Sequence, residues 1–278
     1  MCTMTLEKES EEMEKRGAEE EEEEEEEEQE LSVMEPIEED LVSNIEQILG
    51  YKFGEKKLLA QALTHGSFYN PGRKVGPCYE RLEFLGDAVL GVLMARKVFF
   101  SYTSLPPGQL TLLRGANVDT ERLARIAVES NLHRYLRHKA PQLECQIQEF
   151  MEGMHQYPIH SNGLLDPPKQ LADIVESVIG AIFIDSNSSL ETVWKVFRRV
   201  AEPLIGPDTL GKHPVSELYQ LCQKNRMNVS FMKDTWTEST SVDVLVDGCL
   251  FGSGTCSKKE IAQNRAAKAA LDRLKMIL

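Results

Sequence analysis

Four acidic residues, arranged as two helical pairs, are the residues of this chain whose types and spacing could do chemistry. Glu83 and Asp87 are four positions apart in the stretch ERLEFLGDAVLG, and Asp173 and Glu176 are three positions apart in LADIVESVIGAIF. Side chains at these spacings leave the same face of an α-helix. Each stretch therefore predicts a helix that presents a pair of carboxylates on one side.

The residues around both pairs are apolar, which favours helices that lie inside a fold. Carboxylates buried without partners are costly, and bound cations are the simplest way to offset that cost. Carboxylates with no His or Cys cluster suit Mg²⁺ or Mn²⁺ better than zinc. Two such ions about 3.5–4 Å apart would activate water and stabilise the leaving oxygen of a phosphodiester. Phosphodiester hydrolysis is therefore the indicated chemistry, and a solvated acidic face is the alternative.

The acidic charge of the chain is unevenly placed. The net charge is −14, but residues 1–40 hold 20 acidic and 3 basic residues, so the remainder is mildly basic with 25 acidic and 28 basic residues. Ten consecutive Glu occupy positions 19–28. We expect residues 1–38 to be a disordered tail. It either solvates the chain, mimics a nucleic acid in a basic groove, or binds basic proteins.

Cysteine usage and hydropathy exclude several classes of protein. The six cysteines contain no CxxC pair, so neither a zinc knuckle nor a disulfide framework is indicated. There is no apolar run of about 18 residues and no apolar N-terminal signal, so we expect neither secretion nor a membrane partner. Nucleus, cytoplasm or both are the expected locations.

Helical periodicity begins near Leu41 and continues for about 160 residues, which predicts an all-α domain over 39–205. Asp119 is expected to cap one helix, and Ser188 or Ser189 another. Residues 140–168 are expected to be a long connection beside the site. The apolar positions that define the helices are Leu58, Leu59, Ala62, Leu63, Leu82, Leu85, Val89, Leu93, Leu171, Ile174, Val175, Val178, Ile182, Leu190, Trp194, Phe197, Ala201 and Leu204.

A Gly- and Pro-rich linker at 206–212 precedes a second predicted domain at 213–278. Its helices are expected at about 214–226 and 258–277, with three strands between them. Valines alternate with polar residues before Asp247-Gly248, a two-residue hairpin turn. The predicted order of this domain is therefore α-β-β-β-α.

Three motifs carry a resemblance to a known family. ERLEFLGDAVLG (80–91), KQLADIVESVIGAIF (169–183) and ALTHGS (62–67) resemble the conserved segments of ribonuclease III enzymes. LLRGANVDTERLARIA (112–127) and HSNGLLDPPKQLADIVES (160–177) are similar to plant ribonuclease-III-like endonucleases with one nuclease domain and one double-stranded-RNA-binding domain. The resemblance implies an all-α nuclease domain followed by an RNA-binding domain.

The resemblance also implies roles for individual residues. The metal-binding acids would be Glu83, Asp87, Asp173 and Glu176, of which Asp87 and Glu176 are expected to be catalytic. Glu80 would support the helix and the dimer contact. Lys169 either assists at the phosphate or is a solvated lysine. His65 is expected to be a structural or capping residue in preference to a base, because the metal ions supply the activated water.

Such nuclease domains cut duplex RNA as dimers and leave 5′-phosphates and short 3′ overhangs, so the resemblance implies a homodimer, a double-stranded RNA substrate and no small-molecule cofactor. RNA processing or RNA silencing would be the setting. Phe84 is expected either to contact the partner copy or to be ordinary core. The alternative function, from another class, is a catalytically silent RNA-binding scaffold or competitor.

The closing stretch GSGTCSKKEIAQNRAAKAAL (252–271) resembles a double-stranded-RNA-binding domain, which reads the shape of A-form RNA. Lys258 and Lys259 are expected to contact phosphate at a helix N-terminus, and Arg265 and Lys268 to extend that surface. A protein-binding module is the alternative. Cys256 beside the lysines suggests a redox-sensitive thiol, with an inert cysteine as the alternative.

The first hairpin of this domain departs from the family pattern. The segment 235–241 lacks the Gly-Pro-x-His that usually enters the minor groove, and the loop before Lys258 is slightly longer than usual. We therefore expect modest RNA affinity from this domain alone.

Overall fold

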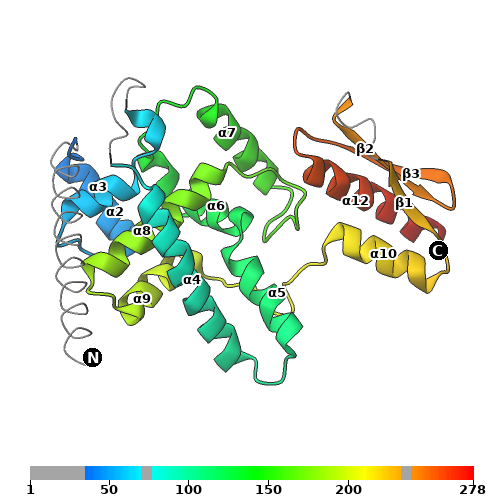
Figure 1. Cartoon of the computed structure of the whole chain (residues 1–278), viewed down its shortest axis with the longest axis horizontal. Coiled ribbons are helices and arrows are strands. Elements are labelled where there is room, and N and C mark those ends of the chain that lie inside the picture. The colour runs from blue at the N-terminus through cyan, green and yellow to red at the C-terminus, as the bar shows by residue number, and fades with distance from the viewer. Residues whose placement is uncertain (1–34, 70–76, 233–238) are drawn as a thin grey trace, which may run out of the picture.

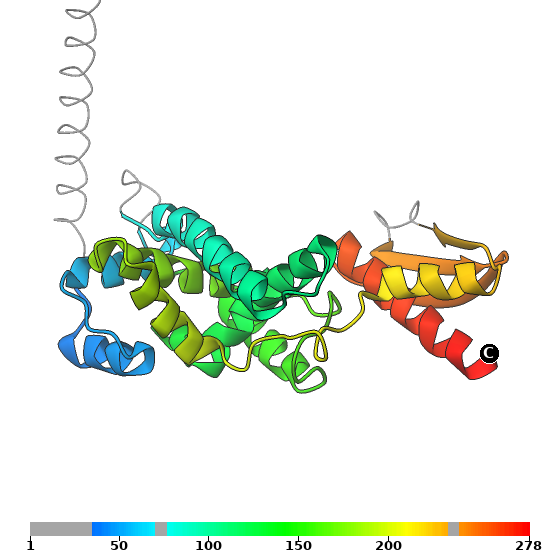
Figure 2. The same cartoon turned by 90° about the horizontal axis from the view of Figure 1, so that it is seen from below.

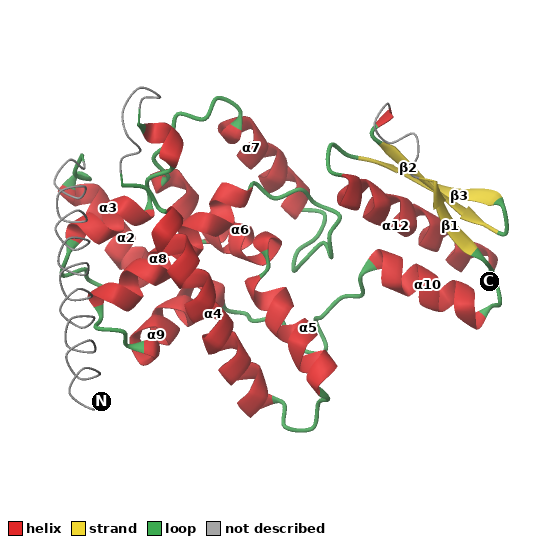
Figure 3. Cartoon of the chain, in the orientation of Figure 1, coloured by secondary structure: helices red, strands yellow, loops and turns green. Residues whose placement is uncertain are grey.

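The computed structural model describes residues 35–69, 77–232 and 239–278, which form a helical part and a smaller α/β part (Figure 1). Most of the predicted acidic tail and most of the first hairpin loop lie outside these residues. Each part has its own hydrophobic core. The expected order of an all-α domain followed by an α-β-β-β-α domain is confirmed (Figure 3).

The regular elements of the first part's described residues are helices, including two 3₁₀ turns at Gly66–Phe68 and Leu132–Tyr135. No helix of the described residues is long and apolar enough to cross a membrane. The α-helices are α2 (Glu39–Leu49), α3 (Lys56–Ala62), α4 (Glu80–Ser101), α5 (Pro107–Val118), α6 (Thr120–Glu129), α7 (Leu143–Met154), α8 (Lys169–Asp185) and α9 (Leu190–Ala201).

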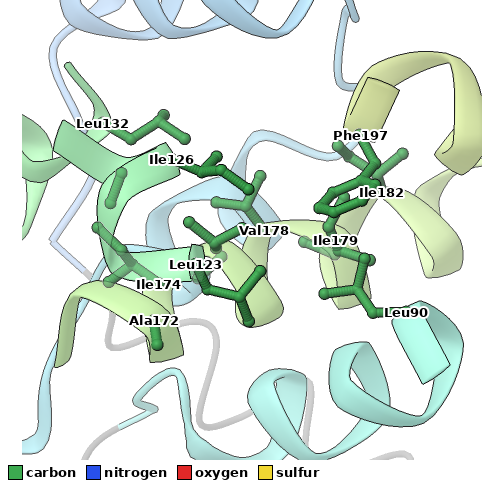
Figure 4. Packing of buried hydrophobic residues seen from close by; sticks show 14 of the residues in the cluster. Leu90, Leu123, Ile126, Leu132, Ala172, Ile174, Val178, Ile179, Ile182 and Phe197 are labelled. Carbon is green, nitrogen blue, oxygen red and sulfur yellow. The ribbon is translucent and has the colours of Figure 1, made fainter. Parts of the chain in front are cut away.

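Helix α8 is the centre of the first core. Its apolar residues face three neighbouring helices, as the sticks in Figure 4 show. Ile174 and Val178 lie near Leu123 and Ile126 of α6, and Phe197 of α9 lies beside Ile182. A helix that is apolar on nearly all sides must be surrounded by others. The expected interior position is therefore confirmed for α8.

Helices α4 and α8 cross so closely that two glycines are required at the crossing. A Cβ atom on Gly86 would lie 1.8 Å from the carbonyl oxygen of Glu176, and a Cβ atom on Gly180 would lie 2.2 Å from that of Leu82. No side chain fits at such distances, so the two backbones touch directly. Glycine inside a helix normally costs stability, and here the close packing explains its presence.

Two predicted helix caps are present. The side chain of Asp119 accepts a hydrogen bond from the backbone N–H of Arg122 at the start of α6. Of the two candidate serines before α9, Ser189 is the cap, and it accepts from the N–H of Thr192. These bonds satisfy backbone donors that have no partner inside the helix.

The expected long connection over 140–168 is wrong, because α7 occupies its first half. Leu143, Ile147 and Phe150 lie at helical spacing, and all three are buried in the first core. The Gly, His and Pro residues that suggested a loop are concentrated after Met154, beyond the helix. The irregular segment is therefore confined to residues 155–168.

The second part contains α10 (Pro214–Lys224), β1 (Val229–Met232), β2 (Ser241–Val246), β3 (Cys249–Thr255) and α12 (Lys259–Ile277). The strands form an antiparallel sheet in the order β1-β2-β3. Alternate valines of β2 are buried against α12, and α10 packs beside α12 (Figure 2). Asp247 and Gly248 both have positive φ angles, 49° and 79°, as the predicted hairpin turn requires.

The α4–α8 crossing predicts that replacing glycine by alanine has opposite effects on stability at two positions of α4. Gly86→Ala should destabilise the protein by about 1–3 kcal/mol or more, since the new methyl group overlaps the backbone of α8. Gly91→Ala should be neutral or stabilising by up to about 1 kcal/mol, because a Cβ there meets no atom within 4 Å and alanine favours helix. Thermal and urea denaturation measure both. Equal effects of the two substitutions would contradict the close crossing.

Candidate active site

A pocket of about 320 Å³ lies between α4, α8 and the N-terminus of α6. Its walls include every acidic residue that the sequence assigned to the site. The lining residues are Glu80, Glu83, Phe84, Asp87, Thr120, Lys169, Ala172, Asp173 and Glu176. Residues about 90 positions apart in the chain are thus brought to one place by the helix crossing.

Three of the four predicted metal ligands converge. One carboxylate oxygen each from Glu83, Asp173 and Glu176 lies within 4.8 Å of the other two. Asp87 is exposed one helical turn further along α4 and lies outside this tight group, although its charge raises the pKa of Glu176. Glu80 is exposed at the opposite end of the pocket.

Asp173 is held by donors on both of its oxygens. The Tyr79 hydroxyl donates to Oδ2 at 3.0 Å, and the Lys169 ammonium donates to Oδ1 at 2.7 Å. Burial raises the pKa of the Asp173 carboxyl, and the neighbouring charge of Glu83 raises it further, while the two donors oppose the shift. This carboxylate therefore has one defined orientation.

Glu176 is the acid whose ionisation is most strongly opposed. Burial raises its pKa to about 8, with further contributions from the charges of Asp87, Asp173 and Glu83. A carboxyl group in this environment keeps its proton near neutral pH unless a cation arrives. The structure thus makes Glu176 the residue that gains most from a bound metal ion.

The pocket already accommodates one cation, the ammonium group of Lys169. Its Nζ atom lies 2.7 Å from an oxygen of Glu83 and 2.7 Å from an oxygen of Asp173. Burial lowers the pKa of this ammonium, but its hydrogen bonds to both carboxylates raise it by more, so it stays charged. An all-oxygen set of carboxylates, of which Asp173 is buried and Glu83 and Glu176 are partly buried, fits Mg²⁺ or Mn²⁺.

Tyr79 is a site residue that sequence reasoning missed. It is 3% exposed, and burial together with the Asp173 charge raises the pKa of its hydroxyl, so it remains a donor. Its ring stacks edge-on against His65, and its backbone N–H donates to the carbonyl of Thr64. Its position directly before α4 could have suggested a place near the site. No sequence pattern, however, shows which way its side chain points.

His65 has the predicted capping role. Its Nδ1 atom accepts from the backbone N–H of Ser67 at the start of the 3₁₀ turn Gly66–Phe68. Burial and the nearby His138 lower the pKa of its imidazole. The ALTHGS segment therefore contacts Tyr79, through His65 and Thr64, and does not line the pocket.

Phe84 is exposed at the rim of the pocket, so the alternative that it is ordinary core is wrong. It is 81% exposed. Other apolar side chains of α4 and α5 are exposed as well, which corrects the expectation that α4 lies wholly inside the domain. They are Val92, Phe99, Phe100 and Leu112.

The residues predicted to bind RNA have partners within the chain. Lys258 pairs with Asp166 of the helical part, and Arg265 donates to the carbonyls of Leu164 and Thr255. Lys268 pairs with Asp272 on the next turn of α12.

Two further residues of this domain were predicted to have a role. Lys259 is exposed and begins α12. Cys256 is half-buried against the second core. Its sensitivity to oxidants remains a prediction.

Comparisons with known proteins agree with this geometry. The ribonuclease III domain family matches residues 80–187, and the double-stranded RNA binding motif matches residues 214–274. A ribonuclease 3-like protein 3 of Oryza sativa is 58% identical over 244 residues, covering 87% of this chain and 81% of the relative.

Two further proteins are similar to this chain over part of its length or of theirs. An endoribonuclease Dicer homolog 1 of Arabidopsis thaliana is 45% identical over 83% of this chain, which spans only 12% of that protein's length. The nuclease domain of ribonuclease III from Campylobacter jejuni aligns with a TM-score of 0.45 at 30% identity, covering 59% of this chain and 98% of that one.

The carboxylate pocket between two crossing helices, the α-β-β-β-α domain and the extent of these matches lead to one conclusion. This chain belongs to the ribonuclease III family, as a ribonuclease III-type endoribonuclease that carries a double-stranded-RNA-binding domain.

Proposed function

We propose that this protein hydrolyses phosphodiester bonds of double-stranded RNA with the help of Mg²⁺ or Mn²⁺ and releases 5′-phosphate ends with short 3′ overhangs. The observation that carries the proposal is the convergence of Glu83, Asp173 and Glu176 oxygens within 4.8 Å. RNA processing or RNA silencing in the nucleus or cytoplasm is the setting we propose.

The same three carboxylates and the nearby Asp87 would hold the metal. When bound, divalent ions activate water and stabilise the leaving oxygen of a phosphodiester. The chain supplies the rest. Asp173 is oriented by Tyr79, and Glu176, whose pKa is raised, would release its proton to solvent if a cation bound beside it.

Lys169 provides a second function in the same pocket. Its side chain is 64% exposed although its ammonium contacts two carboxylates, so a phosphate oxygen can reach it from solvent. A fixed positive charge beside the carboxylates offsets their repulsion of an RNA backbone. We therefore assign Lys169 to the binding of the phosphate group.

The exposed apolar face of α4 and α5 supports a homodimer. Phe84 belongs both to this face and to the rim of the pocket, so a partner covering it would lie beside the active site. Aromatic side chains exposed to this degree are unusual for a monomer and typical of interfaces.

Removing the carboxylate of Glu176 tests the function directly. A long RNA duplex should be cut by the wild-type protein with Mg²⁺ and remain intact with EDTA. Glu176→Gln should lower the cleavage rate by more than about 100-fold, beyond the effect typical of residues that only orient ligands. Glu191→Gln, an exposed acid on α9, is the matched control. Cleavage by Glu176→Gln at the wild-type rate would overturn the assignment.

The raised pKa of Glu176 predicts how stability depends on pH without metal. Between pH 4.5, the ordinary pKa, and about 8, the folded state holds a proton that the unfolded chain has lost. The free energy of unfolding should therefore decrease as pH rises through this window. In EDTA at pH 8–9, Glu176→Gln should melt at a higher temperature than wild type.

Scanning calorimetry from pH 5 to 9 measures this difference. Mg²⁺ should raise the melting temperature of the wild type and raise that of Glu176→Gln by less, because one of the proposed ligands is lost. Identical pH profiles for the two proteins in EDTA would contradict the raised pKa of Glu176.

Replacing Tyr79 by Phe tests whether its hydroxyl positions Asp173. Tyr79→Phe should raise the metal concentration needed for half-maximal cleavage by about 10-fold or more, with a smaller effect at saturating metal. The matched control is Tyr51→Phe, which removes a hydroxyl that donates to Asp185 at the other end of α8. Calorimetric titration of metal gives an independent readout. Equal metal affinity in both variants would exclude the positioning role.

A further inference from the structure

The two domains meet at a surface that neither the nuclease site nor the RNA-binding fold requires. The N-terminal half of α12 lies against residues 161–166, in the loop that precedes α8 (Figures 1 and 2). The Asn264 side chain donates to the carbonyl of Gly163 at 2.9 Å, and Arg265 Nε donates to that of Leu164 at 3.0 Å. Lys258 Nζ lies 2.6 Å from Asp166 Oδ1.

This contact excludes water at its centre. Asn264 is 3% exposed, and Leu164 and Ile261 beside it are 6% and 8% exposed although neither belongs to the core of its own domain. Gly163 has a φ of 85° and approaches Asn264 so closely that a Cβ atom would overlap the amide. The two surfaces are therefore complementary in shape and not merely adjacent.

The nuclease-domain side of the contact is preformed. Ser161 Oγ accepts from the backbone N–H groups of Leu164 and Leu165, and Glu121 of α6 accepts from both the N–H and the hydroxyl of Ser161. His160 is held in turn by Asp119. The loop therefore presents the carbonyls of Gly163 and Leu164 and the carboxylate of Asp166 in fixed positions.

Two of the docking groups, Lys258 and Arg265, are residues that the sequence assigned to RNA. Both contact oxygen atoms of the nuclease domain in this arrangement. We propose that residues 161–166 form a docking surface for the RNA-binding domain, and that a duplex must displace Asp166 from Lys258 to be bound. The inference rests on the RNA-binding role of that domain.

The linker permits such a displacement. Asn117 holds Ile205 by two hydrogen bonds, of 2.8 and 2.9 Å, which anchor the chain to the nuclease domain at that residue, and Leu210 packs against the same core and would have to be released. The eight residues 206–213 that follow span at most about 26–29 Å when extended. The RNA-binding domain can therefore leave the surface and remain within reach of the active site.

Docking that pairs Lys258 and Arg265 with oxygens of the nuclease domain lowers the apparent affinity for duplex, because only the undocked fraction has both groups free of these partners. Asp166→Asn removes one ion pair of the surface, and a partly exposed pair contributes up to about 1 kcal/mol. The dissociation constant of a duplex should therefore fall by up to about fivefold. Asp166→Lys, which adds repulsion, should lower it further.

The experiment uses the full chain in EDTA, so that binding is measured without cleavage. Fluorescence anisotropy with a labelled RNA duplex gives the dissociation constant, and small-angle scattering without RNA reports whether the domains separate. Asp208→Asn, an exposed acid of the linker with the same change in charge, controls for general electrostatic attraction. It should leave the scattering unchanged and alter affinity less than Asp166→Asn does.

A charge-swapped pair separates docking from folding. Asp166→Lys should expand the molecule, and adding Lys258→Glu should restore the compact form, because the ion pair is rebuilt in reverse. Unchanged scattering and affinity in Asp166→Lys would overturn the proposal. If neither the wild type nor any variant binds duplex, the proposed competition between Asp166 and RNA for Lys258 is overturned. Cleavage assays in Mg²⁺ would test the nuclease function separately.

Discussion

The close crossing of α4 and α8 is the constraint on which the site depends. Gly86 and Gly180 let the two backbones touch, and the contact falls on the carbonyl of Glu176 itself. Because Glu83 and Asp87 flank Gly86 on one helix, the crossing sets the distance between the two acidic pairs. Larger residues at either glycine would push the helices apart by the thickness of a side chain, and the carboxylate oxygens would no longer converge within 4.8 Å.

The same crossing creates an electrostatic cost that the surrounding residues manage in different ways. The charged form of Asp173 is stabilised because Tyr79 and Lys169 donate to its two oxygens. Glu176 has no such donor among the described contacts and keeps a proton, with its pKa raised to about 8 by burial and neighbouring acids. The pocket is thus rich in negative charge, and ionisation of Glu176 lowers the stability of the fold at alkaline pH. Function here requires a local arrangement that does not maximise stability.

Helix α6 connects the active site with the second domain. Thr120, at its first position, lines the pocket, and the next residue, Glu121, holds the loop on which the RNA-binding domain rests. Asp119 caps the helix and also binds His160 of that loop. The loop ends at α8, whose first residue is Lys169. One short, well-bonded region therefore carries the start of α8 and the proposed docking surface together.

The sequence by itself determined the elements and most of the chemistry, because helical periodicity, capping residues and acid spacing are local properties. It predicted both domains, a cap at Asp119, a second cap at Ser188 or Ser189, and four site carboxylates, three of which converge. It missed α7, since the nearby Gly and Pro residues masked Leu143, Ile147 and Phe150. Only the tertiary structure decided that Tyr79 orients Asp173, that Phe84 is exposed and that Lys258 faces Asp166. Each of these depends on a direction in space between residues distant in the chain, which no local pattern encodes.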